Sequence, residues 1–333
     1  MNEMTKKYKA FRVEEVEGKF SSAIKEVETS PLEEEELLIK VHYSSLNYKD
    51  ALSATGNKGV TKEYPHTPGI DAVGSIEQSR SARFTVGEKV IVTSYDLGMN
   101  TDGGFGEYIK IPSNWAVRLP TKMAMKEAML LGTAGLTAGM SVARLTASVT
   151  PEDGKIVVSG ATGGVGSIAV AILNTLGYSV VAITGKESEM AYLKSIGASE
   201  IVLRSAFEAF AKRPLLKPLF AGAIDTVGGV ILENIIKSTA AMGVVTCCGN
   251  VASPKLELTV FPFILRGVTL IGIDSQNYPM EHRKNVWEKL AQEWKIDQET
   301  LAYSEVTLEG IEEKIALILR GKLKGRTIIT LVD

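Results

Sequence analysis

Four glycines lie within seven positions near the middle of the 333-residue chain: Gly160, Gly163, Gly164 and Gly166. Glycine-rich turns let backbone N–H groups approach an anion closely, because no Cβ stands in the way. The buried-strand pattern 156–158 precedes them, and a segment with helical apolar spacing follows. The N-terminus of such a helix offers unpaired N–H donors and a positive dipole to phosphates. This pattern predicts a pyrophosphate-binding turn; the alternative is a tight loop that only packs helix against sheet.

The elements around this turn favour the phosphate-binding interpretation. Residues 178–184 have a strand pattern, residues 187–196 a helical pattern closed by Gly197, and residues 200–203 a second strand pattern. Strand, helix, strand, helix, strand is the mononucleotide-binding half of a doubly wound fold. We therefore predict an α/β protein with a dinucleotide-binding Rossmann domain.

The end of the second predicted strand bears on which dinucleotide is bound. Rossmann domains that bind NAD usually carry an acid there, which accepts from the ribose 2′-OH. This strand ends in Thr184-Gly185-Lys186, and Arg204 follows the next strand. A charge-assisted hydrogen bond to a 2′-phosphate is worth about 1.5–3 kcal/mol. The sequence therefore predicts NADPH; the alternative is that Lys186 and Arg204 are solvated surface cations, and Glu187 would weaken the preference.

The metal-ligating residue types are few and scattered. The two cysteines, Cys247 and Cys248, are neighbours on one predicted strand and point to opposite faces. The three histidines lie far apart in the sequence, and no C-x-x-C motif occurs. We expect no metal site.

Composition narrows the possible partners. The formal net charge is −2 and no long basic block occurs, which argues against nucleic-acid or membrane binding. The apolar stretch 261–273 is interrupted by Arg266 and is too short to cross a bilayer. The first residues lack an apolar core of signal-peptide length. We expect a cytoplasmic protein that acts on a small molecule.

The first 120 residues differ from the middle of the chain. Short β-rich runs at 37–41, 72–76, 89–93 and 105–111 alternate with turns rich in glycine and proline. This spacing predicts a compact, barrel-like β domain. The tail of the chain is expected to return to that domain.

Several motifs occur in one order along nearly the whole chain: Asn47-Tyr48-Lys49-Asp50, Pro68-Gly69-Ile70-Asp71, and the segments 87–90, 132–135, 160–166 and 262–275. Together they resemble the medium-chain dehydrogenase/reductase superfamily. More narrowly, they resemble its zinc-free YhdH/YhfP-type quinone oxidoreductases, which include NADPH-dependent acrylyl-CoA reductases.

The resemblance implies an architecture and a set of cofactor contacts. It implies a GroES-like β-barrel catalytic domain (1–125 and 276–333), a Rossmann NADPH-binding domain (126–275), an active site in the cleft between them, and a homodimer through the edge of the Rossmann sheet. The cofactor-binding residues that it implies, together with those derived above, are Tyr48, Thr162, Gly163, Gly164, Val165, Thr184, Gly185, Lys186, Arg204, Asn250, Ile264 and Ser275.

Three neighbouring residues are candidates for polar assistance to the reaction. Tyr48 can orient the nicotinamide or donate a proton, and the amide of Asn47 can donate to an oxyanion. Asp50 either relays a proton or caps the helix that begins there. The leading prediction is an NADPH-dependent reductase of an activated C=C bond, with acrylyl-CoA the substrate implied by the resemblance. The alternatives are a quinone reductase and an NADPH-binding sensor or partner module with weak turnover.

Overall fold

The computed structural model describes residues 5–209 and 213–331. Contacts divide the chain into two compact units, which we call unit 1 (Met1–Thr133, Gln276–Asn285 and Tyr303–Asp333) and unit 2 (Ala134–Ser275 and Val286–Ala302). These units differ from the predicted domains at two places, because 126–133 falls in unit 1 and 286–302 in unit 2. The second difference has a packing reason: Val286, Leu290 and Trp294 lie against Gly139. Residues 1–4 and 332–333 of the predicted first domain lie outside the described residues.

Unit 2 contains a six-stranded parallel sheet with the order β10-β9-β8-β11-β12-β13. Its strands are β8 (Ile156–Val158), β9 (Val180–Thr184), β10 (Ala198–Leu203), β11 (Phe220–Asp225), β12 (Thr239–Cys247) and β13 (Thr269–Gly272). Every residue of β8, β9 and β11 is buried, as expected for strands covered on both faces. This order is that of the doubly wound dinucleotide-binding fold, so the prediction from sequence is confirmed.

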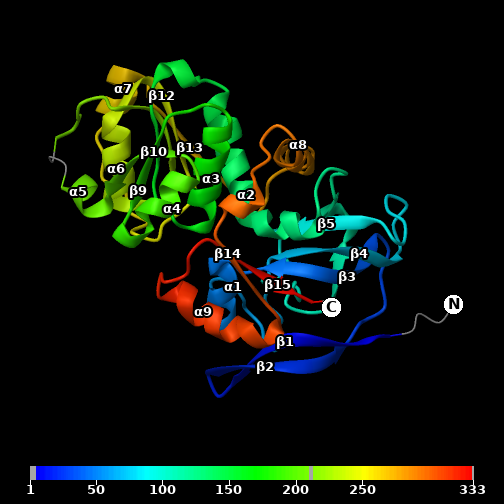
Figure 1. Cartoon of the computed structure of the whole chain (residues 1–333). Helices are drawn as coiled ribbons and strands as arrows, with labels where there is room; N and C mark the ends of the chain where they lie inside the picture. Colours follow the sequence, from blue (N-terminus) through cyan, green and yellow to red (C-terminus); the bar gives the residue numbers. More distant parts are fainter. Residues whose placement is uncertain (1–4, 210–212, 332–333) are drawn as a thin grey trace. The chain divides into compact units, whose positions relative to one another are not determined.

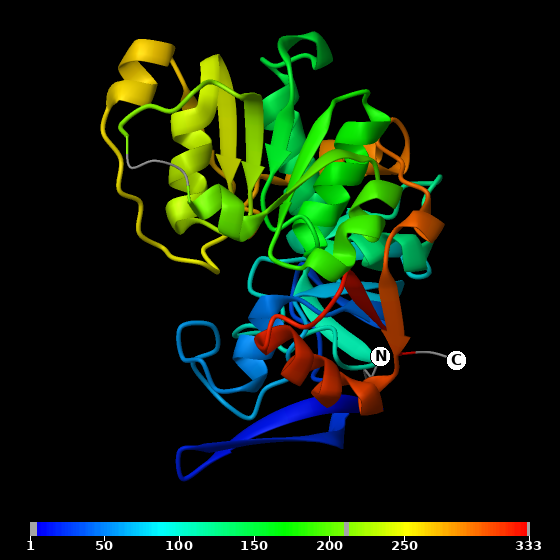
Figure 2. The same ribbon diagram turned by 60° about the vertical axis from the view of Figure 1, so that its left-hand side comes forward.

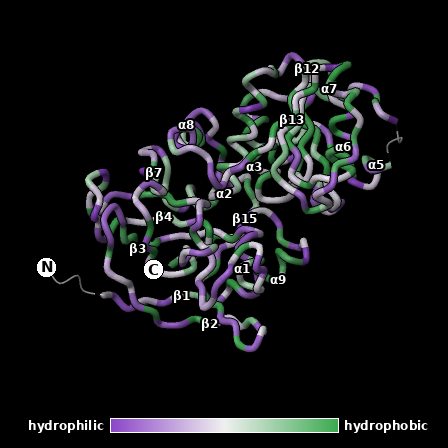
Figure 3. Tube along the Cα trace, turned by 180° about the vertical axis from the view of Figure 1, so that it is seen from behind, coloured by the Kyte–Doolittle hydropathy of each residue, from purple (hydrophilic) through white to green (hydrophobic). Residues whose placement is uncertain are grey.

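Helices cover both faces of this sheet (Figure 1). They are α3 (Gly164–Thr175), α4 (Met190–Ser195), α5 (Arg204–Glu208) and α6 (Gly229–Ser238), with α7 (Phe261–Arg266) beside β12. Apolar side chains of α6 meet those of β8, β9, β11 and β12 in one core cluster. In Figure 3 the strands of this sheet run mainly through hydrophobic colours, which fits their burial.

The longest helix, α2 (Met125–Thr146), is interrupted at Gly132. Gly132 has φ 52° and ψ −152°, which is outside the helical region and is costly for any residue with a Cβ. By length and composition alone α2 is apolar enough to cross a membrane, but 83% of its most apolar window is buried, as in the core helix of a globular protein.

Unit 1 is built mostly from antiparallel strands. The sheet has the order β14-β15-β3-β4-β5-β7, with β6 also paired to β3. Its strands are β3 (Glu36–Ser45), β4 (Asp71–Ser79), β5 (Lys89–Thr93), β6 (Tyr108–Pro112), β7 (Ala116–Arg118), β14 (Tyr303–Val306) and β15 (Arg326–Thr330). The sheet encloses an apolar cluster that includes Ile39, Val41, Ile76 and Val92. The return of the tail to this unit is confirmed, because β15 pairs with β3.

Three further elements complete unit 1. The strands β1 (Lys7–Val16) and β2 (Lys19–Glu28) form a separate hairpin, drawn in dark blue in Figure 2. The helices α1 (Tyr48–Ala54) and α9 (Ile311–Leu319) pack against each other, and their apolar faces share a core cluster with Phe11 and Phe105. The helix α8 (Met280–Ala291) begins in unit 1 and ends in unit 2.

Candidate functional site

The glycine-rich turn between β8 and α3 is shaped partly by packing. Gly160 has φ 57°, and a Cβ there would collide with Thr226. A Cβ at Gly166 would collide with the carbonyl oxygen of Gly160. Close packing alone therefore explains why Gly160 and Gly166 are glycines, and they do not distinguish a packing turn from a phosphate-binding turn.

The other part of the turn has the features of an anion site. Gly163 is the N-cap of the 12-residue helix α3, and no side chain caps this helix end. Gly163 is exposed, and Gly164 and Val165 are half-buried, so this end of α3 is partly open to solvent. Thr162 is almost buried beside them. The N-terminus of a 12-residue helix that no side chain caps is suited to the pyrophosphate of a dinucleotide.

A buried brace behind the turn was not predicted from the sequence. The Ser159 hydroxyl donates to Asp225 Oδ1 (2.6 Å), and the Thr226 hydroxyl donates to the Ser159 carbonyl oxygen (2.9 Å). The backbone N–H of Gly228 donates to Asp225 Oδ2 (2.8 Å). Burial raises the pKa of Asp225. The brace joins the loop after β8 to the loop after β11. The signal for it in the sequence is a single acid, Asp225, directly after the apolar segment 220–224.

The end of β9 meets the start of α5. A Cβ built on Gly185 would lie 3.1 Å from Arg204 Nη2, so the guanidinium lies directly beside the Gly185 backbone. The Thr184 hydroxyl is buried and accepts a hydrogen bond from the backbone N–H of Lys186 (3.0 Å). Arg204 Nε is also 3.9 Å from Glu208 Oε1. The structure thus places the Arg204 guanidinium beside the segment Thr184-Gly185-Lys186. Binding of a 2′-phosphate by these residues stays a prediction.

The remaining predicted cofactor residues of unit 2 lie on other segments. Asn250 is exposed, and its Cα lies near Gly228 in the loop after β11. Ile264 is 68% exposed on α7, and Ser275 is half-buried after β13. Their contacts with a cofactor stay predictions.

Both cysteines of unit 2 are free thiols. Burial raises the pKa of Cys248 to about 12 and also raises that of Cys247. Neither residue is therefore a ready thiolate nucleophile at neutral pH.

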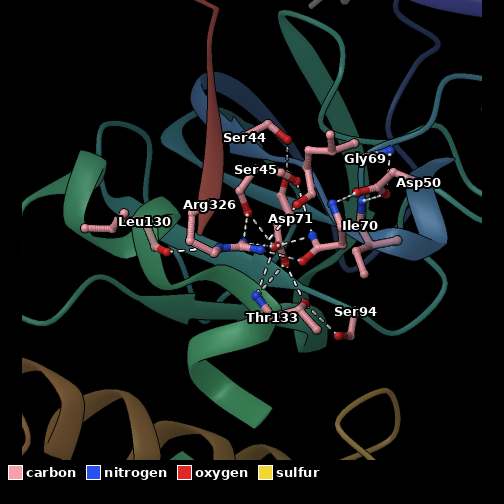
Figure 4. A network of polar contacts seen from close by, with 12 residues as sticks. Ser44, Ser45, Asp50, Gly69, Ile70, Asp71, Ser94, Leu130, Thr133 and Arg326 are labelled. Carbon is pink, nitrogen blue, oxygen red and sulfur yellow. Dashed lines mark hydrogen bonds and ion pairs between the residues drawn. The ribbon is translucent and has the colours of Figure 1, made fainter. Parts of the chain in front are cut away.

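A buried polar network in unit 1 is centred on Asp71, the first residue of β4 (Figure 4). Asp71 Oδ2 accepts from the Ser45 hydroxyl (2.6 Å) and from Asn47 Nδ2 (2.7 Å). The backbone N–H of Thr133 donates to both carboxylate oxygens (2.9 and 3.0 Å), and the Thr133 hydroxyl donates to Oδ1 (2.6 Å). The carboxylate is therefore almost fully hydrogen-bonded without water.

Arg326, the first residue of β15, completes the network (Figure 4). Its Nη2 donates to the Ser45 hydroxyl (2.8 Å) and lies 3.7 Å from Asp71 Oδ2. Its Nη1 donates to Asn47 Oδ1 (3.2 Å), and its Nε donates to the Leu130 carbonyl oxygen (3.1 Å). Burial lowers the pKa of Arg326, and the charges of Asp71 and Asp50 oppose this change. Arg326 was not predicted as a site residue, because no motif surrounds it in the last part of the sequence.

The three predicted catalytic residues share one turn but differ in exposure. Asn47 caps α1, and its amide group donates to Asp71 Oδ2 and to the Ser45 carbonyl oxygen (3.2 Å), which uses both amide protons. Asp50 is 0% exposed and accepts from the backbone N–H groups of Asn47 (2.7 Å) and Ile70 (2.8 Å). Tyr48 is 46% exposed. Of the three, Tyr48 is the most exposed, and Asn47 is half-buried.

Asp50 has an unusual electrostatic environment. Burial raises its pKa to about 7, with a further contribution from the charge of Asp71. Hydrogen bonds from the backbone N–H groups of Asn47 and Ile70 oppose the shift. The capping interpretation of Asp50 is supported by its hydrogen bond from the backbone N–H of Asn47. A role as a proton relay stays a prediction.

This network does not fit a zinc ion. Across residues 5–209 and 213–331, no group of three or more His, Cys, Asp or Glu side chains could hold a metal. The one carboxylate at the centre, Asp71, already accepts hydrogen bonds from Ser45, Asn47 and Thr133. Zinc sites are normally built from Cys, His and carboxylate ligands, and the amide and hydroxyl groups here are not such ligands. We therefore derive no chemical step through a metal.

Comparisons with known proteins place the chain in a family. Residues 33–121 match the model of the alcohol dehydrogenase GroES-like domain, and residues 164–293 match that of the zinc-binding dehydrogenase. YhfP of Bacillus subtilis, which bears the name quinone oxidoreductase, is 42% identical over 98% of this chain and 100% of its own length. The chain belongs to the YhdH/YhfP group of the medium-chain dehydrogenase/reductase superfamily. It is thus an oxidoreductase, and the predicted GroES-like and Rossmann architecture is confirmed.

Other members of this group add detail. The acrylyl-CoA reductase AcuI of Ruegeria pomeroyi is 38% identical, over 95% of this chain and 96% of its own length. The structure of YhdH from Salmonella enterica in complex with NADP has a TM-score of 0.93 and 39% identity, and covers 97% of this chain and 100% of that one. The structure of B. subtilis YhfP with NAD bound has a TM-score of 0.95 and 42% identity, with 98% and 100% coverage. The expectation of a nicotinamide cofactor agrees with both structures.

Proposed function

We propose that this protein is an NADPH-dependent, zinc-independent reductase that transfers hydride to an activated C=C bond, with conversion of acrylyl-CoA to propionyl-CoA as its reaction. The observation that carries the proposal is the likeness, over nearly the full length of both chains, to an enzyme named acrylyl-CoA reductase. The hydrogen-bonded network around Asp71 supports it, because this network leaves no place for the metal that an alcohol dehydrogenase needs.

The choice of NADPH rests on the end of β9. Arg204 lies beside Gly185, and the strand ends in a threonine and a lysine with no acid at its tip. An acid in that place would repel a 2′-phosphate, whereas two cations attract it. Relatives are known with NADP and with NAD bound, so the family alone does not decide the cofactor. The bound NADPH supplies the hydride that reduces the β-carbon of the substrate.

Unit 1 supplies the polar groups of the proposed reaction. Hydride addition to the β-carbon leaves negative charge on the substrate carbonyl oxygen, which needs a hydrogen-bond donor. We assign this contact to the Tyr48 hydroxyl, because its side chain is exposed. Asn47 and Asp50 support the turn that carries Tyr48, since their polar atoms already hold hydrogen bonds within the unit. The α-carbon then takes a proton from solvent water to complete the reduction.

The decisive experiment compares three substrates. NADPH oxidation is followed by absorbance with acrylyl-CoA, crotonyl-CoA and a quinone, each over a range of concentrations. We expect the highest kcat/KM with acrylyl-CoA and propionyl-CoA as its product by mass spectrometry. Turnover of the quinone alone would favour the second candidate function, quinone reduction, which the 42% identity to YhfP supports. NADPH binding without turnover of any of the three would favour a sensor or partner module.

A homodimer in the cytoplasm is part of the same proposal. The strand β13 lies at the end of the sheet order, so one of its edges pairs with no other strand in the described part of the chain. The helix α7, which precedes β13 in the chain and packs beside β12, exposes Ile264 (68%) and Leu265 (63%), and Val260 (61%) precedes this helix. An unpaired edge with exposed apolar side chains next to it is suited to a second copy of the same chain.

A further inference from the structure

Tyr48 follows Asn47 at the start of α1, and the residues that hydrogen-bond the Asn47 side chain lie on strands far away in the sequence. We infer that Asp71 and Arg326 are positioning residues for the reaction: they fix the turn at Asn47, and through it the direction in which Tyr48 presents its hydroxyl. This inference rests on the proposed function and adds two residues to the site.

Asn47 is held at three points. Its Nδ2 donates to Asp71 Oδ2 (2.7 Å), and its Oδ1 accepts from Arg326 Nη1 (3.2 Å). Its backbone N–H donates to Asp50 Oδ2 (2.7 Å). These three partners come from β4, β15 and α1, so the residue directly before Tyr48 is fixed in position by three separate elements.

Asp71 and Arg326 are themselves fixed. Asp71 accepts from Ser45 (2.6 Å) and from the Thr133 hydroxyl (2.6 Å), and Arg326 donates to the Leu130 carbonyl oxygen (3.1 Å). A side chain bound in this way cannot turn without breaking several hydrogen bonds at once. A well-satisfied buried network is rigid, which is the property that a positioning device needs.

Neither residue is suited to direct contact with a ligand. The side chain of Asp71 is 0% exposed and that of Arg326 is 5% exposed. The oxygens of Asp71 already accept from a hydroxyl, an amide and a backbone N–H group. Any effect of Asp71 and Arg326 on turnover must therefore act through the residues that they hydrogen-bond. Among these residues, Asn47 directly precedes the exposed Tyr48.

The first test compares Asp71→Asn with Ile76→Ala. Both residues are buried in β4, but Ile76 lies in the apolar cluster and outside the network. For Asp71→Asn we expect kcat to fall roughly 10- to 100-fold, the range that misplacement of a catalytic group produces. NADPH affinity should stay within about twofold, because the cofactor's phosphates bind unit 2. Ile76→Ala should lower the melting temperature and leave kcat close to the wild-type value.

A second measurement separates positioning from general destabilisation. In a Tyr48→Phe background, Asp71→Asn should lower kcat by no more than about twofold further, because the hydroxyl it positions is already gone. If the double variant loses kcat by the full product of the two single-variant factors, the inference is overturned. If Asp71→Asn does not fold, Thr133→Val replaces it, since it removes the hydroxyl donor to Asp71 and keeps the backbone N–H.

Hydrogen exchange tests the inference without any turnover. Asp71→Asn and Arg326→Lys should raise amide exchange about tenfold in the segment 46–54 relative to the wild type, and Ile76→Ala should not raise it selectively. Unchanged exchange in this segment would overturn the inference, as would raised exchange with an unchanged kcat. Lack of turnover by the wild-type protein with all three substrates would overturn the proposed function instead, and exchange alone would then decide whether Asp71 and Arg326 hold the turn.

Discussion

At the scale of single residues, a buried aspartate stabilises a different turn in each of the two units. Asp71 and Asp225 are both buried acids at the end of a strand, and both accept from hydroxyl and backbone donors. Asp225 braces the glycine-rich turn between β8 and α3, whereas Asp71 braces the turn that carries Tyr48. A third buried acid, Asp50, has a pKa that burial raises to about 7. Its charge state therefore changes near neutral pH.

The raised pKa of Asp50 predicts a stability that depends on pH. Its pKa is about 7 in the folded protein and 3.8 in its ordinary state, so folding favours the protonated form. The stability it contributes is fully present below about pH 4 and is lost as the pH rises through about 7, by roughly 1.4 kcal/mol for each unit between the two pKa values. Urea unfolding between pH 4 and 8 measures this, with Asp50→Asn as the comparison. The Asp50→Asn variant should have a lower free energy of unfolding overall, but that free energy should depend less on pH than in the wild type. The same pH dependence in both proteins would contradict the raised pKa of Asp50.

Cofactor preference is the other prediction at this scale. Replacing Lys186 or Arg204 by alanine removes a cation that would meet a 2′-phosphate, at a cost of about 1.5–3 kcal/mol. NADPH should then bind roughly 10- to 100-fold more weakly, whereas NADH, which lacks the phosphate, should change little. Fluorescence titration with both cofactors measures the two affinities. Lys194→Ala, at a cation of the following helix, serves as the control. Equal losses for NADPH and NADH would show that neither residue reads the phosphate.

At the scale of elements, glycines fix the course of two helices. Gly160 and Gly166 bring the start of α3 against β8 and the loop after β11. Gly132 interrupts α2 beside the Asp71 network, where a Cβ would lie 2.5 Å from Ser45 Oγ and 2.8 Å from Arg326 Nη2. The kink in α2 and the network therefore depend on the same residue.

This dependence predicts a difference between two glycine substitutions. Gly177 has φ 82° with open space around its Cβ position, so Gly177→Ala carries backbone strain alone, about 1 kcal/mol. Gly132→Ala carries the same kind of strain and also a collision with the network, and it should lower the free energy of unfolding by at least ~2 kcal/mol more. Chemical denaturation of both variants gives the comparison. If both variants lose the same free energy of unfolding, the residues of the Asp71 network can shift to make room for the added Cβ at little cost.

At the scale of the whole molecule, local patterns predicted well and distant pairings did not. The glycine turn, the strands around it and the absence of an acid after β9 are features of neighbouring residues, so sequence reasoning could find them. The Asp71 network could not be found in that way, because Arg326 meets Ser45 across 281 positions and no local pattern announces the pairing. The exposure of the three candidate residues could not be predicted from the sequence either: Asp50 is fully buried and Asn47 is half-buried, whereas Tyr48 is 46% exposed.

The proposed dimer gives the last prediction, since it concerns the assembly. If the edge of β13 and the face of α7 meet a second copy, Leu265→Glu places a charge in an apolar interface that cannot pair it. The dimer dissociation constant should rise about 100-fold or more, which sedimentation or light scattering over a dilution series will measure. Val86→Glu is the matched control, because Val86 is similarly exposed (67%) but belongs to unit 1. A wild-type monomer, or a dimer that both variants weaken equally, would show that copies of this chain do not associate through this edge.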